Sequence, residues 1–339
     1  MGGYLEKATF ICGHRKGGTT LLLCLLDNHP QLLVYPPDSA FFYGYYPTYA
    51  DTDHTDQERI DRVAGFIADQ LENEIQKLKP EDQKALDFNM TGFREDIRSF
   101  ASEKETTPGN LLESVFRAYR NHFDGSMTPL RWVEKTTSTE IYAGEVIKWF
   151  PKAKFVHLVR DPRDNWASLK SGWQKRYQNF NDTPERLLQS MIDRGRLGLE
   201  FAMANSERFG DNVYKVFRFE DLVNFPREIL GHICEFLGVE FSEEIMKPTV
   251  CGKIWKGNNF DGLEFERPSS VNVGRWSERI TEYEASLIEF HFREVMDHFG
   301  YERSKSIEDC CDAATSHYKW YNFSQAYSQL TRKDGQASK

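Results

Sequence analysis

The chain lacks any apolar run long enough to cross a bilayer. A transmembrane helix needs about 20 apolar residues, and no stretch of the 339 residues approaches that length. The N-terminus also lacks a basic region followed by an apolar core, and Glu6 stands where a myristoylation signal requires Ser or Thr. We therefore expect a cytoplasmic protein with no membrane span. A luminal Golgi protein is the alternative, if a longer chain carries an anchor ahead of this sequence.

The chain also has few cysteines, and its basic residues are outnumbered by acidic ones. The six cysteines show no C-x-x-C spacing, so no metal site is expected. The 43 Lys and Arg residues are outnumbered by 52 Asp and Glu residues, which gives a formal net charge of −9. Proteins that bind nucleic acid usually present a basic face, so no nucleic-acid partner is expected. Any anionic ligand must be held by a local basic pocket.

Short apolar segments alternate with helical segments along most of the chain. The predicted strands are Ala8–Cys12, Arg131–Glu134, Lys154–Val159 and Val213–Phe217, and the predicted helices are Thr19–Asn28, Ile141–Phe150, Arg163–Lys170 and Glu220–Leu237. This alternation predicts an α/β fold with a central parallel sheet flanked by helices. We expect one domain over residues 1–339, with a helical cap insertion at about 56–121 and a C-terminal tail at about 301–339.

A glycine-containing turn joins the first strand to the first helix. The segment Gly13–Thr20 follows a strand and opens a helix, so its backbone N–H groups can cradle an anion. It matches the G-x-x-x-x-G of nucleotide-triphosphate P-loops, but Thr19 stands where that motif requires Lys before Ser or Thr. Lys16 lies inside the loop instead. The turn therefore suits a phosphosulfate better than ATP with magnesium, although a simple helix-capping glycine turn would look similar.

Two motifs resemble those of sulfotransferases that use 3′-phosphoadenylyl sulfate (PAPS). Lys16–Leu22 resembles the family's 5′-phosphosulfate loop, (R/K)-S-G-T-T-x-L, with Gly17 in place of Ser or Thr. Phe155–Ser168 resembles its 3′-phosphate site, in which a strand ends in R-D-P and a Ser follows eight residues after the Arg. Here these residues are Arg160 and Ser168. Guanidinium groups bind phosphate through two parallel hydrogen bonds.

Two later segments resemble the same family. Phe219 precedes Glu-Asp-Leu where the family has Tyr, so its ring could stack near adenine without hydrogen-bonding. Ser269–Trp276 resembles the loop that closes over the 3′-phosphate, but lacks the R-K-G of cytosolic members. The resemblance implies a P-loop-containing nucleotide-binding fold, PAPS as co-substrate and no metal. The nucleotide-binding residues it implies are Arg15, Lys16, Gly17, Gly18, Thr19, Thr20, Arg160, Ser168, Phe219, Ser270, Gly274 and Arg275.

The resemblance also implies catalytic residues. Lys16 and Lys135 match lysines that contact the leaving-group oxygen and the sulfuryl group, where positive charge stabilises the transition state. Cytosolic members take the acceptor's proton with the His of K-T-H, which is Thr137 here. Other members use a Glu after the loop helix, and Asp38 occupies that place, as in a bacterial or Golgi-like branch. Asp38 could instead be a turn carboxylate, and His14 is the reserve base.

The predicted reaction is transfer of a sulfuryl group from PAPS to a hydroxyl or amine acceptor, with a small molecule or glycan favoured. Two alternatives remain open at this point. A P-loop kinase would share the fold, but it needs the Lys-Ser/Thr that Thr19-Thr20 replaces. A non-catalytic module would bind nucleotide without turnover. The sequence predicts no oligomeric state.

Overall fold

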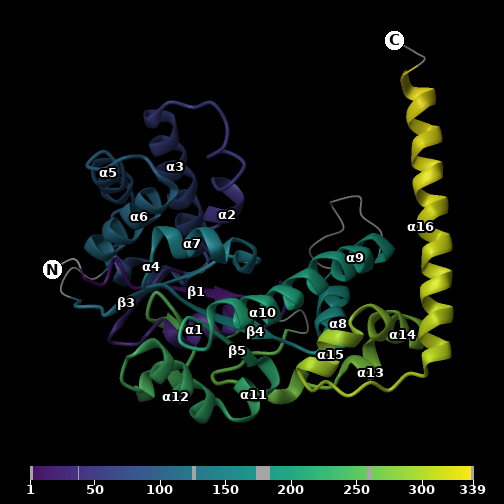
Figure 1. Cartoon of the computed structure of the whole chain (residues 1–339). Helices are drawn as coiled ribbons and strands as arrows, with labels where there is room; N and C mark the ends of the chain where they lie inside the picture. The colour runs from purple at the N-terminus through teal and green to yellow at the C-terminus, as the bar shows by residue number, and fades with distance from the viewer. Residues whose placement is uncertain (1–2, 37, 124–126, 173–183, 258–261, 337–339) are drawn as a thin grey trace. The chain divides into compact units, whose positions relative to one another are not determined.

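The computed structural model describes residues 3–36, 38–123, 127–172, 184–257 and 262–336 (Figure 1). The chain divides into two compact units. Unit 1 comprises Met1–Arg160 and Leu197–Val271, and unit 2 comprises Asp161–Arg196 and Asn272–Lys339. None of the described helices is both long and apolar enough to span a membrane.

Unit 1 is built on a five-stranded parallel sheet with the order β2-β3-β1-β4-β5. The strands are β1 (Ala8–Cys12), β2 (Leu32–Val34), β3 (Arg131–Lys135), β4 (Lys154–Val159) and β5 (Tyr214–Arg218). Every residue of β1 and β3 is buried, as expected where helices cover both faces of a parallel sheet. A separate antiparallel hairpin pairs β6 (Thr249–Val250) with β7 (Lys253–Ile254). The predicted α/β fold is confirmed.

Alternation along the strands sends aromatic side chains to one face of the sheet. Phe10 lies opposite Glu134 on β3 and Phe155 on β4, and its ring stacks on that of Phe155 with centroids 5.6 Å apart. These rings join Trp132 and Tyr214 in a core shared with nearby helices. Those helices are α3 (Asp56–Ile75), α5 (Met90–Ala101), α6 (Pro108–Phe123) and α7 (Ala143–Trp149). Figure 1 shows α3, α5 and α6 grouped on one side of the sheet.

Unit 1 contains further helices besides α3, α5, α6 and α7. They are α1 (Thr19–Leu26), α2 (Phe41–Gly44), α4 (Pro80–Leu86), most of α10 (Arg196–Phe209), α11 (Phe219–Asn224) and α12 (Pro226–Leu237). In Figure 1, α1 and α12 lie on the side of the sheet away from α3, α5 and α6. The stretch from 56 to 121 contains α3 to α6, and no strand occurs there among the described residues.

Two local predictions differ from the structure. The single helix expected at Glu220–Leu237 is two helices, α11 and α12, because Phe225 leaves the helical conformation and Pro226 starts a new helix. Proline suits the first turn of a helix, where its missing N–H costs nothing. Strand β2 was not predicted, because three residues are too few to show the apolar pattern of a strand.

Unit 2 is helical. It contains α8 (Pro162–Gly172), α9 (Pro184–Ser190), α13 (Trp276–Arg279), α14 (Glu282–His291), α15 (Arg293–His298) and α16 (Ile307–Gln336). A buried ion-pair cluster joins two of these helices, because Arg163 on α8 donates to Asp161 and to Glu289 on α14, each at 2.7 Å. Glu289 also accepts from the backbone N–H groups of Ser304 and Lys305, at 3.0 and 2.8 Å. The cluster fixes the start of α8.

Candidate active site

The carboxyl ends of the five parallel strands bring the predicted site residues of unit 1 to one edge of the sheet. The phosphate loop follows β1, and Arg160 follows β4 directly. Lys135 ends β3, and Asp38 lies four residues beyond β2. The chain leaves β1 toward β2 on one side of the sheet and leaves the neighbouring strand β4 toward β5 on the other side. Such a switch point is where open α/β sheets bind ligands.

The loop between β1 and α1 has the tight backbone of an anion cradle. The Gly17 N–H donates to the His14 carbonyl at 2.9 Å, and Lys16 adopts a positive φ of 63°. Gly18 has a φ of 99°, and a Cβ there would lie 2.3 Å from the Phe219 ring. Only glycine fits this position. Gly18 is the N-cap of α1 and has no side chain that could cap it, so it leaves the first N–H groups of the helix to other acceptors.

Arg160 and Phe219 support this loop. The Arg160 guanidinium donates to the Lys16 carbonyl at 3.0 Å and lies 4.4 Å from the centre of the Phe219 ring. Phe219 is buried against Gly18. Its stacking on adenine stays a prediction, and its observed contacts are with the loop. Arg160 therefore lies against the phosphate loop, and its contact with a phosphate stays a prediction.

The other loop residues differ in exposure. His14 and Thr19 are buried, whereas Arg15, Lys16 and Thr20 are partly exposed. Beneath the loop, the Gly13 N–H donates to the Glu140 carboxylate at 3.2 Å. Burial raises the pKa of Glu140 to about 7. Below that pH the Glu140 carboxyl is largely neutral. A neutral group under the loop suits a loop that is predicted to bind an anion.

Asp38 and Lys135 are in direct contact. The Lys135 ammonium donates to Asp38 Oδ2 at 3.0 Å, with side chains that are 8% and 29% exposed, respectively. The backbone N–H of Ala40 donates to the other oxygen, Oδ1, at 2.9 Å. Asp38 is therefore a turn carboxylate and also the partner of the predicted catalytic lysine. The turn interpretation is therefore observed, and the role of Asp38 as the base stays a prediction.

Sequence reasoning missed one carboxyl group at this edge. Glu134 is fully buried on β3 and accepts from the hydroxyls of Ser39 and Thr136, each at 2.5 Å. Burial raises the pKa of Glu134 to about 7, against the lowering effect of these two hydrogen bonds. One signal was available, because a carboxylate inside a strand buried on both faces needs a reason to be there.

The candidate residues for the 3′-phosphate are divided between the units. Arg160 and the exposed Ser270 belong to unit 1, whereas Ser168, Gly274 and Arg275 belong to unit 2. A joint phosphate site formed by Arg160 and Ser168 therefore stays a prediction.

Within unit 2, Asp164 on α8 fixes the turn that carries Gly274 and Arg275. Its carboxylate accepts from the N–H groups of Gly274 and Trp276, at 2.6 and 2.9 Å. Ser168, one helical turn after Asp164 on α8, is partly exposed. Two predicted 3′-phosphate segments are thus held by one helix.

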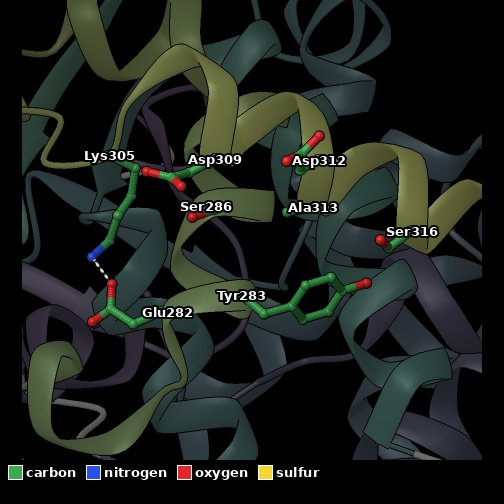
Figure 2. Close-up of a pocket in the computed structure, with 8 residues that line it drawn as sticks. All are labelled: Glu282, Tyr283, Ser286, Lys305, Asp309, Asp312, Ala313 and Ser316. Atoms are coloured by element: carbon green, nitrogen blue, oxygen red, sulfur yellow. Dashed lines mark hydrogen bonds and ion pairs between the residues drawn. The ribbon is translucent and has the colours of Figure 1, made fainter.

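A cavity of about 420 Å³ lies in unit 2 between α14 and the start of α16 (Figure 2). It is lined by Glu282, Tyr283, Ser286, Lys305, Asp309, Asp312, Ala313 and Ser316. Glu282 and Lys305 form an ion pair there. The remaining charged groups, Asp309 and Asp312, are acidic, so this cavity is unsuited to an anionic nucleotide. It contains none of the predicted site residues.

The parallel sheet, the glycine loop at its switch point and the basic residues beside that loop define an α/β protein with a central parallel sheet flanked by helices. Residues 8–243 match the family model described as "Sulfotransferase family". The chain therefore belongs to the sulfotransferase family and is a sulfotransferase.

Two solved structures are similar over most of the chain. One is the sulfotransferase domain from the Synechococcus PCC 7002 olefin synthase, with 19% identity, a TM-score of 0.56, and coverage of 87% of this chain and 95% of that one. The other is the sulfotransferase domain from the curacin biosynthetic pathway, with 17% identity, a TM-score of 0.56, and coverage of 88% and 99%. At these identities the likeness shows a shared fold. No curated protein matches the sequence.

Proposed function

We propose that this sulfotransferase uses PAPS as the sulfuryl donor, acts on a hydroxyl or amine acceptor, and releases adenosine 3′,5′-bisphosphate. The observation that carries the proposal is the meeting of Asp38 and Lys135 at the sheet edge that also bears the phosphate loop. A base, a positive charge and an anion cradle serve the transfer of a sulfuryl group to a hydroxyl, and Asp38, Lys135 and the loop can supply them. Family membership favours this reaction over a kinase.

The loop fits the phosphosulfate end of the donor. The N-terminus of α1 after Gly18 and the partly exposed Lys16 supply donors and positive charge. Arg160, which contacts the Lys16 carbonyl, adds a second positive charge on the β4 side. The Lys-Ser/Thr that would seat magnesium is replaced by Thr19-Thr20. These features support a donor bound through backbone amides and cations.

With a hydroxyl acceptor, the chemical step exchanges one sulfur–oxygen bond for another. The acceptor oxygen forms a bond to sulfur, and the bond between sulfur and the bridging phosphate oxygen breaks, with its electron pair leaving on the phosphate. The acceptor's proton goes to Asp38 Oδ2, and the Lys135 ammonium then offsets charge on the transferred group and its leaving oxygen. Lys16 assists from the loop side. An amine acceptor that is already neutral needs less help from Asp38.

Tyr43 supports a small-molecule or glycan acceptor. The residue is 56% exposed, although its hydroxyl donates to the Thr137 carbonyl two residues beyond Lys135. Burial of the hydroxyl and then the charge of Asp38 raise the pKa of Tyr43. A fixed aromatic ring beside the base offers a flat surface for the apolar face of a sugar or ring system. The proposal places the acceptor over Tyr43.

Calorimetry with adenosine 3′,5′-bisphosphate and AMP tests the donor assignment. The proposal expects the bisphosphate to bind at least about tenfold more tightly, because each charged hydrogen bond to the 3′-phosphate contributes ~1.5–3 kcal/mol. Equal affinities would remove Arg160 and Ser168 from the nucleotide site. Tighter binding of ATP with magnesium than of the bisphosphate would favour a kinase.

A further inference from the structure

The segments that carry Asp38 and Lys135 meet on one buried carboxyl group. Glu134 Oε1 accepts from the hydroxyl of Ser39 and from the hydroxyl of Thr136, each at 2.5 Å. Ser39 directly follows Asp38, and Thr136 directly follows Lys135. The two hydroxyl oxygens lie 3.3 Å apart, so the three side chains form one compact cluster. Glu134 is therefore linked to both neighbours of the proposed catalytic pair.

The cluster also fixes the backbone of the turn that presents Asp38. Ser39 Oγ accepts from the Phe41 N–H at 3.2 Å while it donates to Glu134. Ala40, between these residues, has a φ of 53°, a left-handed conformation that non-glycine residues seldom adopt. Such strain persists only where surrounding contacts enforce it, and it gathers at functional sites. The Ala40 N–H in turn donates to Asp38.

Burial of the Glu134 carboxyl group at this position is energetically unfavourable. It lies in a fully buried strand, and its Oε2 atom makes no hydrogen bond with any described residue. An apolar side chain would fill β3 without that cost. The charges nearby are those of Asp38 and Lys135, whose effects on the Glu134 pKa have opposite signs. What the carboxyl group supplies, and an apolar side chain would not, is an acceptor for two hydroxyls at once.

We propose that Glu134 is a positioning residue for sulfuryl transfer. Through the hydroxyls of Ser39 and Thr136 it holds the side chains of Asp38 and Lys135 in contact with each other. The inference rests on the proposed function, because it concerns the pair assigned to proton transfer and charge stabilisation. Glu134 touches neither substrate in this scheme. A misplacement of catalytic groups by about 1 Å can cost ~100-fold in rate, so loss of the cluster is expected to slow turnover and spare nucleotide binding.

The hydroxyl variants provide the sharpest test, because they keep the carboxyl group and the sheet. Thr136→Val and Ser39→Ala are each expected to lower kcat ~10- to 100-fold, with affinity for adenosine 3′,5′-bisphosphate within twofold of wild type. Thr249→Val is the matched control, since Thr249 also donates from a buried hydroxyl to a buried carboxylate, Asp27, at 2.8 Å. It is expected to lower the melting temperature and leave kcat within about twofold.

Two Glu134 variants separate the acceptor role from the charge. Glu134→Gln keeps an oxygen that accepts both hydroxyls and is expected to retain kcat within about fivefold, whereas Glu134→Ala should match the hydroxyl variants. Adding Thr136→Val to Glu134→Ala should lower kcat little further, because the Thr136 hydroxyl acts through its contact with Glu134. Full additivity of the two effects, or wild-type kcat in both hydroxyl variants, would overturn the inference.

A crystal structure of Thr136→Val gives a readout independent of activity. The inference expects the 3.0 Å contact between Lys135 and Asp38 to be lost or lengthened while the core around Phe10 and Trp132 is unchanged. An unchanged contact would contradict it. If the wild-type protein transfers no sulfuryl group from PAPS, the proposed function fails, and this structural comparison decides the positioning role of Glu134 by itself.

Discussion

At the residue scale, Asp38 has the role that kinetics can test most cleanly. Asp38→Asn keeps the size of the side chain and the oxygen that accepts from Ala40, but cannot take a proton. We expect kcat on a hydroxyl acceptor to fall ~10²–10⁴-fold, the usual value of general-base assistance, with bisphosphate affinity nearly unchanged. Steady-state kinetics and calorimetry on the same preparation provide the measurement.

The control for this substitution is Asp51→Asn, because Asp51 is an exposed turn carboxylate in the same unit. It should leave kcat unchanged. A stable Asp38→Asn protein with near-wild-type turnover would mean that Asp38 is not the base, and His14 would be the next candidate.

Gly18 has a backbone conformation on which the phosphate loop depends. In Gly18→Ala the new methyl group would meet the Phe219 ring at 2.3 Å, at a φ that L-residues rarely adopt. We expect at least a ~10-fold loss of bisphosphate affinity, measured by calorimetry. Gly231→Ala, on α12 with open space around the added methyl group, should bind normally. Normal affinity in Gly18→Ala would show that the loop does not hold the nucleotide.

Residues were predictable from the sequence where a motif fixes their neighbours. Lys16, Lys135 and Arg160 all lie at the carboxyl edge of the sheet, as the order of strand and loop indicated. Glu134 was not predictable, because its importance depends on hydroxyls from two segments, one of them 95 residues away. Contacts of that separation leave no local pattern. The contact of Phe219 with Gly18 was hidden for the same reason.

At the scale of elements, prediction succeeded where apolar runs were long enough. Strands β1 and β4 have the predicted bounds, whereas the three residues of β2 gave no signal. The break between α11 and α12 was marked by Pro226, which the helical periodicity on either side obscured. The partition into two units follows from contacts between distant segments, such as Arg163 with Glu289, which the sequence does not reveal.

Helix α8 is the element whose role in nucleotide selectivity can be tested without touching the phosphate loop. Asp164→Ala removes the acceptor that holds Gly274 and Trp276. Since each hydrogen bond to a charged group contributes ~1.5–3 kcal/mol, we expect the preference for adenosine 3′,5′-bisphosphate over AMP to shrink about tenfold. Affinity for AMP itself should change little. An unchanged preference would separate the turn at Gly274 from the 3′-phosphate.

At the scale of the whole molecule, stability should depend on pH through the buried carboxyl groups. Burial raises the pKa of Glu140 from 4.5 to about 7, so folding favours its protonated form. Its contribution is present below about pH 4.5 and is lost as the pH rises through about 7. Carboxyls with lowered pKa values, such as Glu284 and Glu289, act in the opposite sense at acidic pH.

Glu140→Gln removes this titration and isolates its effect. The melting temperature of wild type relative to the variant should fall between pH 5 and pH 8, which calorimetric scans at both values measure. A constant difference would mean that Glu140 does not titrate in this range in the folded protein.

Transfer of label from PAPS tests the central claim most directly. Purified protein is incubated with ³⁵S-labelled PAPS and cell extract after exhaustive chelation, and the labelled product is identified by mass spectrometry. The account predicts a labelled hydroxyl or amine product formed one-for-one with adenosine 3′,5′-bisphosphate, formed without added metal because the loop lacks the Lys-Ser/Thr that seats magnesium. It also predicts that Lys135→Ala forms far less product. Equal labelling by Lys135→Ala, or activity that is abolished by chelation and restored by one metal ion, would contradict it.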